Sequence, residues 1–183
     1  KLKAKGYEIT VICPPDEKNA HYFTDLGIKL LTVPMSRKGT NIKEDLQLVK
    51  NLFKVYKKEK CDLVFHYTIK PNIYGTLAAK LAGIKSIAIT TGLGYVFLHN
   101  NITSLIAKFM YKFSLAFANE VWFLNDDDMN IFLDKDLITE RQAFKLPSEG
   151  INTKRFVPKE KSRKDNKTVF LMIARVLYDK GFN

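Results

Sequence analysis

Three consecutive carboxylates, Asp126, Asp127 and Asp128, form the densest cluster of side chains that could do chemistry, and they follow the apolar run EVWFL. Asp126 and Asp128 satisfy a D-x-D pattern, whose oxygens could hold a divalent ion on a nucleotide diphosphate. Asn125 followed by acidic residues is also typical of a helix N-terminus, where a capping amide and negative charge are both favoured. We favour helix capping and keep the metal site as an alternative.

Two further groups of polar residues follow apolar runs. Arg175 and Lys180 come after TVFLMIA, where two cations beside a helix N-terminus could bind a diphosphate, although a surface pair would look the same. His66, Lys70 and Asn72 follow CDLVFH, where open α/β sheets bind their ligands. Lys70 could meet a phosphate. His66 and Asn72 could instead be a satisfied strand-end histidine and part of a helix start.

Several common catalytic signatures are absent from the sequence. Gly92 and Gly94 begin a possible G-x-G-x-x-G, but Phe97 stands where the third glycine is required, so a nicotinamide-cofactor site is not supported. There is no Walker-type phosphate loop and no G-x-S-x-G elbow. The three histidines lack metal-ligand spacing, and the two cysteines lie far apart, which indicates free thiols in a reducing cytoplasm.

Apolar runs alternate with stretches of helical periodicity. Strands are predicted at residues 8–13, 28–33, 61–66, 85–90, 120–124, 143–146 and 168–174, and helices at residues 43–60, 71–83 and 102–118. Strands that are apolar nearly throughout and separated by helices are typical of a parallel sheet with both faces covered. The predicted fold class is therefore α/β, with a Rossmann-like parallel sheet and helices on both faces.

The composition changes towards the carboxyl end. Residues 152–167 are polar and charged, and an apolar run follows them. We expect residues 1–151 to form a Rossmann-like domain, residues 152–167 to be an interdomain linker and residues 168–183 to begin a second domain. The opening KLKAKGYEIT resembles the end of a helix and the strand after it, so we expect the first strand of the domain to be missing and the chain to be truncated.

The charge is strongly positive, at +11 from 30 Lys+Arg against 19 Asp+Glu. Such a field attracts polyanions, and its lysine-dominated composition fits diffuse attraction better than base readout in nucleic acid. No apolar run reaches the ~18 residues that a membrane-spanning helix requires.

Two predicted helices carry candidate membrane-surface lysines. On residues 43–60 the apolar positions Leu46, Val49, Phe53 and Tyr56 face away from a basic stripe made of Lys43, Lys50, Lys54, Lys57 and Lys58. A solvated surface explains the stripe, and so does attraction to anionic lipid head groups. On residues 102–118, Lys108 and Lys112 are further candidates, and we expect the aromatic side chains of that helix to lie in the core.

Five stretches together resemble a known family. They are DLVFHYTIKPNIYG, TTGLGYVF, VWFLNDDD, LPSEGINTKRFVP and FLMIARVLYDKG. Their order and spacing resemble those of bacterial family-4 glycosyltransferases of the GT-B type, in particular members that build capsular, O-antigen or glycan chains on a polyprenyl diphosphate lipid. The resemblance extends over nearly the whole chain.

The resemblance implies a two-domain hexosyltransferase. Its amino-terminal half would bind the acceptor, and its carboxyl-terminal half would bind a nucleotide sugar, expected to be UDP-linked, without cofactor or structural metal. Arg175 and Lys180 match the pair that holds the donor diphosphate, and Gly92 and Gly94 match the loop that faces the acceptor. His66, Lys70 and Asn72 are our other acceptor-binding candidates. Many relatives have a histidine in the loop after the fourth strand, but residues 91–94 here read TGLG, so the catalytic residue stays unknown.

The expected activity of the full protein is transfer of a sugar to a polyprenyl-diphosphate-linked saccharide. It would act in the cytoplasm, peripherally on the inner face of the cell membrane, with an anionic membrane surface as partner and no nucleic acid. The chain alone should be inactive, because the rest of the donor domain is missing. The alternatives are a metal-dependent D-x-D transferase, a nucleotide-sugar epimerase of the same build, and a non-enzymatic basic module that binds lipid or nucleic acid.

Overall fold

The computed structural model describes residues 2–18, 20–36, 41–93, 102–147, 150–158 and 168–173. The chain divides into two units, Lys1–Glu149 and Gly150–Asn183. The described helices and strands all lie in the first unit. The described residues of the second unit form turns and irregular backbone, so the strand predicted at residues 168–174 is not formed over residues 168–173. A strand requires a hydrogen-bonding neighbour, and residues 168–173 have no ladder partner in the described part of the chain.

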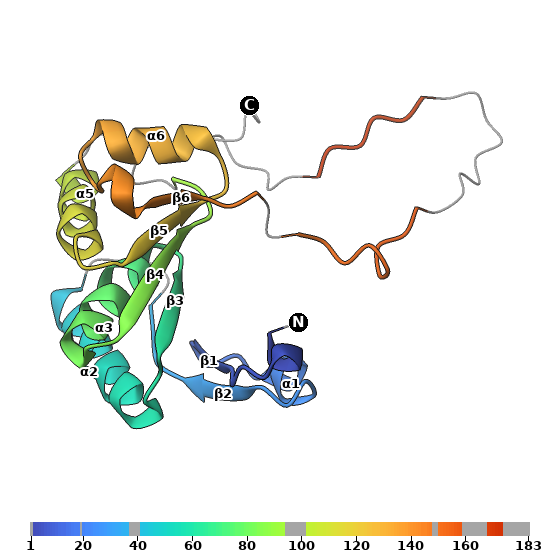
Figure 1. The fold of residues 1–183 in the computed structure, drawn as a ribbon, viewed down its shortest axis with the longest axis horizontal. Helices are drawn as coiled ribbons and strands as arrows, with labels where there is room; N and C mark the ends of the chain where they lie inside the picture. The colour runs from blue at the N-terminus through green and yellow to red at the C-terminus, as the bar shows by residue number, and fades with distance from the viewer. Residues whose placement is uncertain are drawn as a thin grey trace. The chain divides into compact units, whose positions relative to one another are not determined.

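Six strands of the first unit form two parallel sheets (Figure 1). The two-stranded sheet contains β1 (Thr10–Cys13) and β2 (Lys29–Thr32), and the four-stranded sheet contains, in this order, β3 (Leu63–Tyr67), β4 (Lys85–Thr90), β5 (Glu120–Phe123) and β6 (Ala143–Lys145). The register sets His66 opposite Ala88 and Trp122 opposite Phe144. Each predicted strand within the first unit is therefore present, with bounds that differ by a few residues.

Helices connect the parallel strands, as crossovers of this kind require. They are α1 (Ala20–Thr24), α2 (Ile42–Glu59), α3 (Thr76–Ala82), α5 (Ile102–Leu115) and α6 (Asp126–Asp134), with the short helical turns η1 (Lys3–Lys5), η2 (Pro71–Gly75) and η3 (Glu140–Gln142). The Asn41 side chain caps α2 by accepting from two backbone amides of its first turn. The predicted helix 71–83 is present as a π-helical turn, η2, that continues into α3 and stops at Gly83, where φ is +75°.

Parallel strands joined by helices confirm the predicted α/β fold class, and helices lie on both sides of the two-stranded sheet. Side chains of a strand alternate between its two faces. Ile12 of β1 packs in the core cluster that contains Leu48 of α2. The next residue, Cys13, lines a hollow together with Phe23 of α1. The two helices therefore cover opposite faces of the two-stranded sheet.

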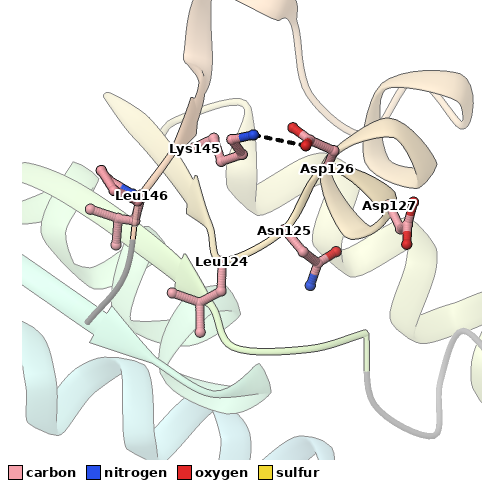
Figure 2. Close-up of a pocket in the computed structure, with 7 residues that line it drawn as sticks. Leu124, Asn125, Asp126, Asp127, Lys145 and Leu146 are labelled. Carbon is pink, nitrogen blue, oxygen red and sulfur yellow. Dashed lines mark hydrogen bonds and ion pairs between the residues drawn. The ribbon is translucent and has the colours of Figure 1, made fainter. Parts of the chain in front are cut away.

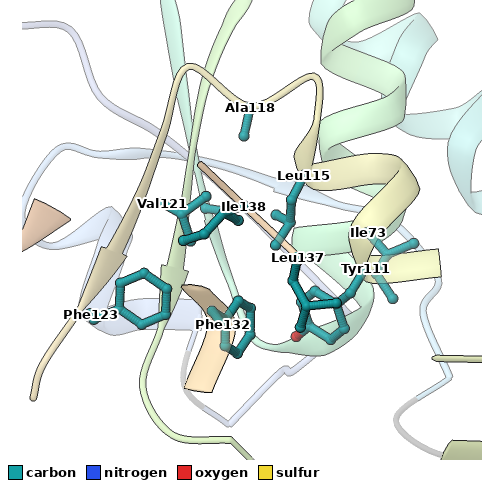
Figure 3. Close-up of a cluster of buried hydrophobic side chains, with 10 residues drawn as sticks. Ile73, Tyr111, Leu115, Ala118, Val121, Phe123, Phe132, Leu137 and Ile138 are labelled. Atoms are coloured by element: carbon teal, nitrogen blue, oxygen red, sulfur yellow. The ribbon is translucent and has the colours of Figure 1, made fainter. Parts of the chain in front are cut away.

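A second core cluster joins α5 and α6 to the four-stranded sheet (Figure 3). Phe132 of α6 is fully buried, and its ring meets those of Phe123 and Tyr111 edge-on, with centroids 5.1 and 5.7 Å away. Leu115 of α5 and Val121 of β5 are also fully buried in this cluster.

Both long helices bury a different set of residues from the one we predicted. On α2, Asp45, Leu48, Leu52 and Tyr56 are buried, whereas Leu46 is 65% exposed. The basic stripe still faces outward, because the buried set is rotated by only about one residue.

On α5, the prediction that aromatic side chains lie in the core is confirmed for Tyr111 and was wrong for the phenylalanines. Its most apolar face, with Leu105, Phe109 and Phe113, is exposed, and its buried face contains Ser104, Tyr111, Ser114 and Leu115. Small side chains let α5 approach η2 and the sheet closely. The buried Ser114 hydroxyl is satisfied by donating to the Met110 carbonyl at 2.8 Å, so a polar residue is tolerated in the core.

We expect Phe132→Ala to lower the free energy of unfolding by about 3–5 kcal/mol, because it leaves a cavity between α5, α6 and β5. Phe144→Ala, on the partly exposed face of β6, is the matched control and should cost less than about 1 kcal/mol. Urea unfolding monitored by circular dichroism measures both. Equal losses for the two variants would contradict the assignment of this core.

Candidate functional site

The carboxyl ends of β3, β4, β5 and β6 all lie at one edge of the four-stranded sheet, because the strands are parallel. The segments that leave this edge begin at residues 68, 91, 124 and 146. Open α/β sheets bind ligands at this edge. The predicted acceptor-binding residues and the carboxylates of the D-x-D pattern are close to it in sequence.

An open hollow of about 490 Å³ lies at the ends of β5 and β6 (Figure 2). Its lining residues are Leu124, Asn125, Asp126, Asp127, Lys145, Leu146 and Pro147. Figure 2 shows Lys145 and Asp126 reaching towards each other from either side of the hollow, and their charged groups pair at 2.7 Å. Asp127 points away from this pair.

The acidic run at this hollow forms a helix N-terminus. The Asn125 side chain accepts a hydrogen bond from the Asp128 amide at 2.8 Å, and its own amide donates to the Asp128 carboxylate at 3.0 Å. The capping interpretation of the sequence is therefore confirmed. Of the two carboxylates in the D-x-D pattern, Asp126 pairs with Lys145 and Asp128 with Asn125. Within the described ranges, no three His, Cys, Asp or Glu side chains gather where they could hold one metal ion.

Lys70 takes part in a buried charge cluster just beyond β3. Its ammonium pairs with Asp45 of α2 at 2.7 Å, and the Tyr74 hydroxyl donates to the other Asp45 oxygen, also at 2.7 Å. The side chains of Lys70 and Asp45 are 15% and 8% exposed. Burial, and then the adjacent Asp45, raise the pKa of Tyr74, so the phenol keeps its proton and remains a donor. Asp45 thus offsets the positive charge of Lys70.

His66 lies in the core between α2 and α3 instead of at a ligand surface. Its Nε2 is 2.9 Å from the Tyr56 hydroxyl and its Nδ1 is 3.2 Å from the Thr76 hydroxyl. A Cβ at Gly75 would come within 2.6 Å of the ring, so the absence of a side chain there makes room for the imidazole. Because both ring nitrogens are already engaged, this geometry does not support contact between His66 and a ligand.

Asn72 is also buried, but it lies beside the end of β4. Its Nδ2 donates to the Ile89 carbonyl at 3.1 Å and thereby positions the last residues of that strand. Its Oδ1 and the hydroxyl of Thr90, the last residue of β4, have no hydrogen-bond partner among the residues that the structure describes. Buried polar atoms normally have a hydrogen-bond partner. Two hydrogen-bonding atoms at the carboxyl end of β4 are therefore left unsatisfied by the described residues.

The remaining predicted site residues divide into three groups. Gly92 follows β4 with a φ of +150°, a conformation that favours glycine. Gly94, Arg175 and Lys180 lie outside the described residues. The membrane-surface candidates are all on described helices, and only Lys108 is half-buried; the exposed ones are Lys43, Lys50, Lys54, Lys57, Lys58 and Lys112.

Asp45 and Tyr74 are partners of Lys70 that we did not predict. A usable signal was present, because residues 45, 48, 52 and 56 share one face of a helix, and a carboxylate among apolar residues on that face needs a partner. The sequence around residue 45 does not show that this partner is Lys70, because Lys70 is 25 residues away.

We expect His66 to make the protein less stable in acid. Burial lowers its pKa from 6.5 to about 4, so between these values the unfolded chain binds a proton that the folded chain does not. The free energy of unfolding should therefore fall as the pH is lowered from 6.5 towards 4, by about 3 kcal/mol in all at ~1.4 kcal/mol per unit. Chemical unfolding at a series of pH values measures this loss.

His66→Gln is the control for that experiment, because it keeps a hydrogen-bonding side chain but cannot be protonated in this range. The two proteins are otherwise identical, so only the histidine contribution should disappear in the variant. The same slope in the variant and the unmodified chain would contradict the prediction.

A family model described as glycosyl transferase 4-like matches residues 1–125. The chain is 32% identical over 199 residues to the N,N'-diacetylbacillosaminyl-diphospho-undecaprenol alpha-1,3-N-acetylgalactosaminyltransferase of Campylobacter jejuni, covering 98% of this chain and 52% of that protein. It is 26% identical over 185 residues to the UDP-Gal:alpha-D-GlcNAc-diphosphoundecaprenol alpha-1,3-galactosyltransferase of Escherichia coli, covering 96% and 47%. The chain spans about half the length of the curated relatives that it matches.

The fold is similar to that of HepE from Anabaena, whose crystal structure contains UDP and glucose. The TM-score is 0.57 at 16% identity, over 78% of this chain and 38% of that protein. This likeness concerns the fold alone and agrees with the predicted half of a GT-B architecture. The family resemblance inferred from the five sequence stretches is confirmed by the family model, which matches more than half of the chain. The chain belongs to the glycosyl transferase 4-like family.

Proposed function

We propose that the chain is the acceptor-binding part of a hexosyltransferase that extends a polyprenyl-diphosphate-linked saccharide in the synthesis of a bacterial surface polysaccharide or glycan. One observation carries the proposal. Almost the whole chain aligns, at 32% identity, with a transferase whose name specifies a diphospho-undecaprenol acceptor. A second relative, also named for such an acceptor, transfers galactose.

The reaction that we propose exchanges one bond for another at the anomeric carbon of the donor sugar. The bond from this carbon to the donor phosphate oxygen breaks, and a bond to an acceptor hydroxyl oxygen forms. The hydroxyl proton is released, and the nucleoside diphosphate leaves with the bonding electron pair. Negative charge grows on the leaving diphosphate, so cations placed beside it stabilise the transition state.

The donor in this proposal is a nucleotide sugar, with UDP as the nucleotide, and Arg175 and Lys180 bind its diphosphate. Support for UDP comes from one relative, which is named as using UDP-Gal, and from the fold neighbour, which binds UDP and glucose. Residues 1–151 are then the acceptor domain, residues 152–167 the linker and residues 168–183 the beginning of the donor domain. The division of the chain after Glu149 lies close to the first of these boundaries.

The acceptor site that we propose lies at the carboxyl edge of the four-stranded sheet, where Gly92 and Gly94 belong to the segment after β4. Asn72 is a positioning residue there, because it acts through the Ile89 carbonyl at the end of the same strand. Lys70 meets the acceptor phosphates with its charge partly offset by Asp45. We no longer include His66, because both of its ring nitrogens are engaged in the core.

The location that we propose is the cytoplasmic face of the cell membrane, where the protein binds peripherally. Among the described residues, no helix is both long enough and apolar enough to cross a bilayer. The exposed lysines of α2 form one basic face, and each lysine close to an anionic membrane contributes about 1 kcal/mol of attraction.

The donor role predicts that Arg175→Ala with Lys180→Ala abolishes sugar transfer by the full-length protein. We expect kcat/KM to fall by at least about 100-fold with a polyprenyl-diphosphate-linked saccharide and the best of a panel of nucleotide sugars. The matched control is Arg163→Ala with Lys164→Ala, which removes the same two charges from the polar segment. Normal transfer by the first variant would refute the donor role.

The same assay separates the alternatives. Loss of activity in a chelator would favour the metal-dependent reaction that uses Asp126 and Asp128. An epimerised nucleotide sugar formed without acceptor would favour an epimerase. Absence of any sugar product, together with tight binding of nucleic acid in a filter assay, would favour a non-enzymatic basic module.

The basic face of α2 predicts salt-sensitive binding to anionic vesicles. Replacement of Lys50, Lys54 and Lys57 by Gln should remove about 3 kcal/mol of attraction at low salt, which is about 100-fold in affinity. Replacement of Lys5, Lys135 and Lys154 by Gln removes the same charge from other exposed sites and is the control. Co-sedimentation with phosphatidylglycerol-containing vesicles measures both, and equal losses would mean that only net charge matters.

A further inference from the structure

The outer face of α5 is apolar and exposed. Phe109 is 67% exposed and Phe113 is 50% exposed, although both are large aromatic side chains on a well-packed helix. The exposed apolar side chains on and just after α5, here called the α5 stripe, are Ile102, Leu105, Ile106, Phe109, Phe113 and Phe117. Their spacing of three and four residues sets them on one side of the helix, which has 3.6 residues per turn.

Packing among the described residues of the first unit does not explain the α5 stripe. The core side of α5 is already occupied, because Tyr111 and Leu115 are buried against η2, α6 and the sheet. The stripe points the other way. Contiguous exposed apolar surface of this kind is uncommon on proteins that stay in water, and it marks a contact surface.

Positive charge accompanies the stripe. By helical spacing, Lys108 and Lys112 lie on its flank, between the stripe and the buried side of α5, and Lys112 is exposed. The Lys80 ammonium of α3 lies 5.5 Å from the centre of the Phe117 ring at the other end. An apolar stripe bordered by lysines is the pattern of a helix that lies in the interface of an anionic bilayer.

The position of α5 relates the stripe to the proposed acceptor edge. The crossover from β4 to β5 begins at the carboxyl edge of the sheet and returns to the opposite edge, so the first residues of α5 lie on the side of the carboxyl edge. Figure 1 shows α2, α3 and α5 on the same side of the four-stranded sheet, and α3 contacts both of the others. The basic face of α2 and the α5 stripe therefore belong to one helical layer.

We infer that the α5 stripe inserts into the head-group and acyl boundary of an anionic bilayer and holds the carboxyl edge of the sheet at the depth of a lipid-linked diphosphate. The inference rests on the proposed function in one respect, the lipid-linked acceptor. The lysines of α2 supply long-range, salt-sensitive attraction. The stripe supplies short-range apolar binding that salt does not screen.

The direct test uses fluorescence of a residue inside the stripe. The chain has a single tryptophan, Trp122, so Phe109→Trp in a Trp122→Phe background reports on the stripe alone. We expect its emission to shift to the blue on vesicles that contain phosphatidylglycerol, and brominated lipid to quench it. Tyr22→Trp in the same background, at an exposed site in α1, is the control and should do neither.

The second measurement is vesicle binding in 0.5 M salt, roughly where the Debye length falls to a few ångströms and charge attraction is largely screened. Leu105→Ser with Phe109→Ser should weaken the remaining binding by roughly tenfold or more. Leu26→Ser with Tyr22→Ser removes comparable exposed apolar surface elsewhere and should leave it unchanged. All four positions are exposed, so the substitutions should not unfold the chain.

Three results would overturn the inference. The first is tryptophan emission at position 109 that does not respond to vesicles. The second is a blue shift without vesicles that grows with protein concentration, which means that a second copy covers the stripe. The third is a blue shift without vesicles only in a longer form of the protein, which means that another segment covers it. Transfer by the full-length protein to a water-soluble acceptor analogue reports on the proposed function separately, because it does not require the bilayer.

Discussion

Parallel hydrogen bonding of β3, β4, β5 and β6 constrains the rest of the first unit more than any other interaction. Two parallel neighbours cannot be joined by a tight turn, so each connection must cross the sheet, and here the connections include η2 with α3, then α5, then α6. The same pairing brings the four strand ends to one edge. A fold with antiparallel pairs would distribute these segments between two edges, and the residues after the neighbouring strands β3 and β4 would not share one side of the sheet.

Burial of polar groups along α2 shows how tertiary contacts pair side chains that the sequence presents as candidates for ligand binding. Asp45 and His66 would each be costly to bury alone, since an unpaired carboxylate or imidazole loses its water without compensation. Lys70 and Tyr74 pair with the carboxylate, and the hydroxyls of Tyr56 and Thr76 engage the imidazole. These contacts join α2 to β3, η2 and α3. Side chains that could serve a ligand therefore contribute to the packing between these elements.

The helical layer on this side of the sheet has two kinds of outer surface. The outer face of α2 is basic, and that of α5 is apolar with lysines on its flank. Charge acts over about a Debye length, whereas apolar burial requires contact. A surface that combines them is suited to approach an anionic membrane from a distance and then remain there when salt weakens the attraction.

The sequence by itself determined the α/β class, the strands of the first unit, the helix cap at Asn125 and the family, because these follow from local periodicity, local hydrogen bonds and ordered motifs. Only the tertiary structure decided which face of α5 is buried, where His66 lies, and that Lys70 pairs with Asp45. Periodicity identifies the faces of a helix and ranks them by apolarity. Which face is buried depends on how well its shape fits the elements packed against it. On α5, a face with small serines, whose hydroxyls can bond within the helix, fits more closely than a face of phenylalanines.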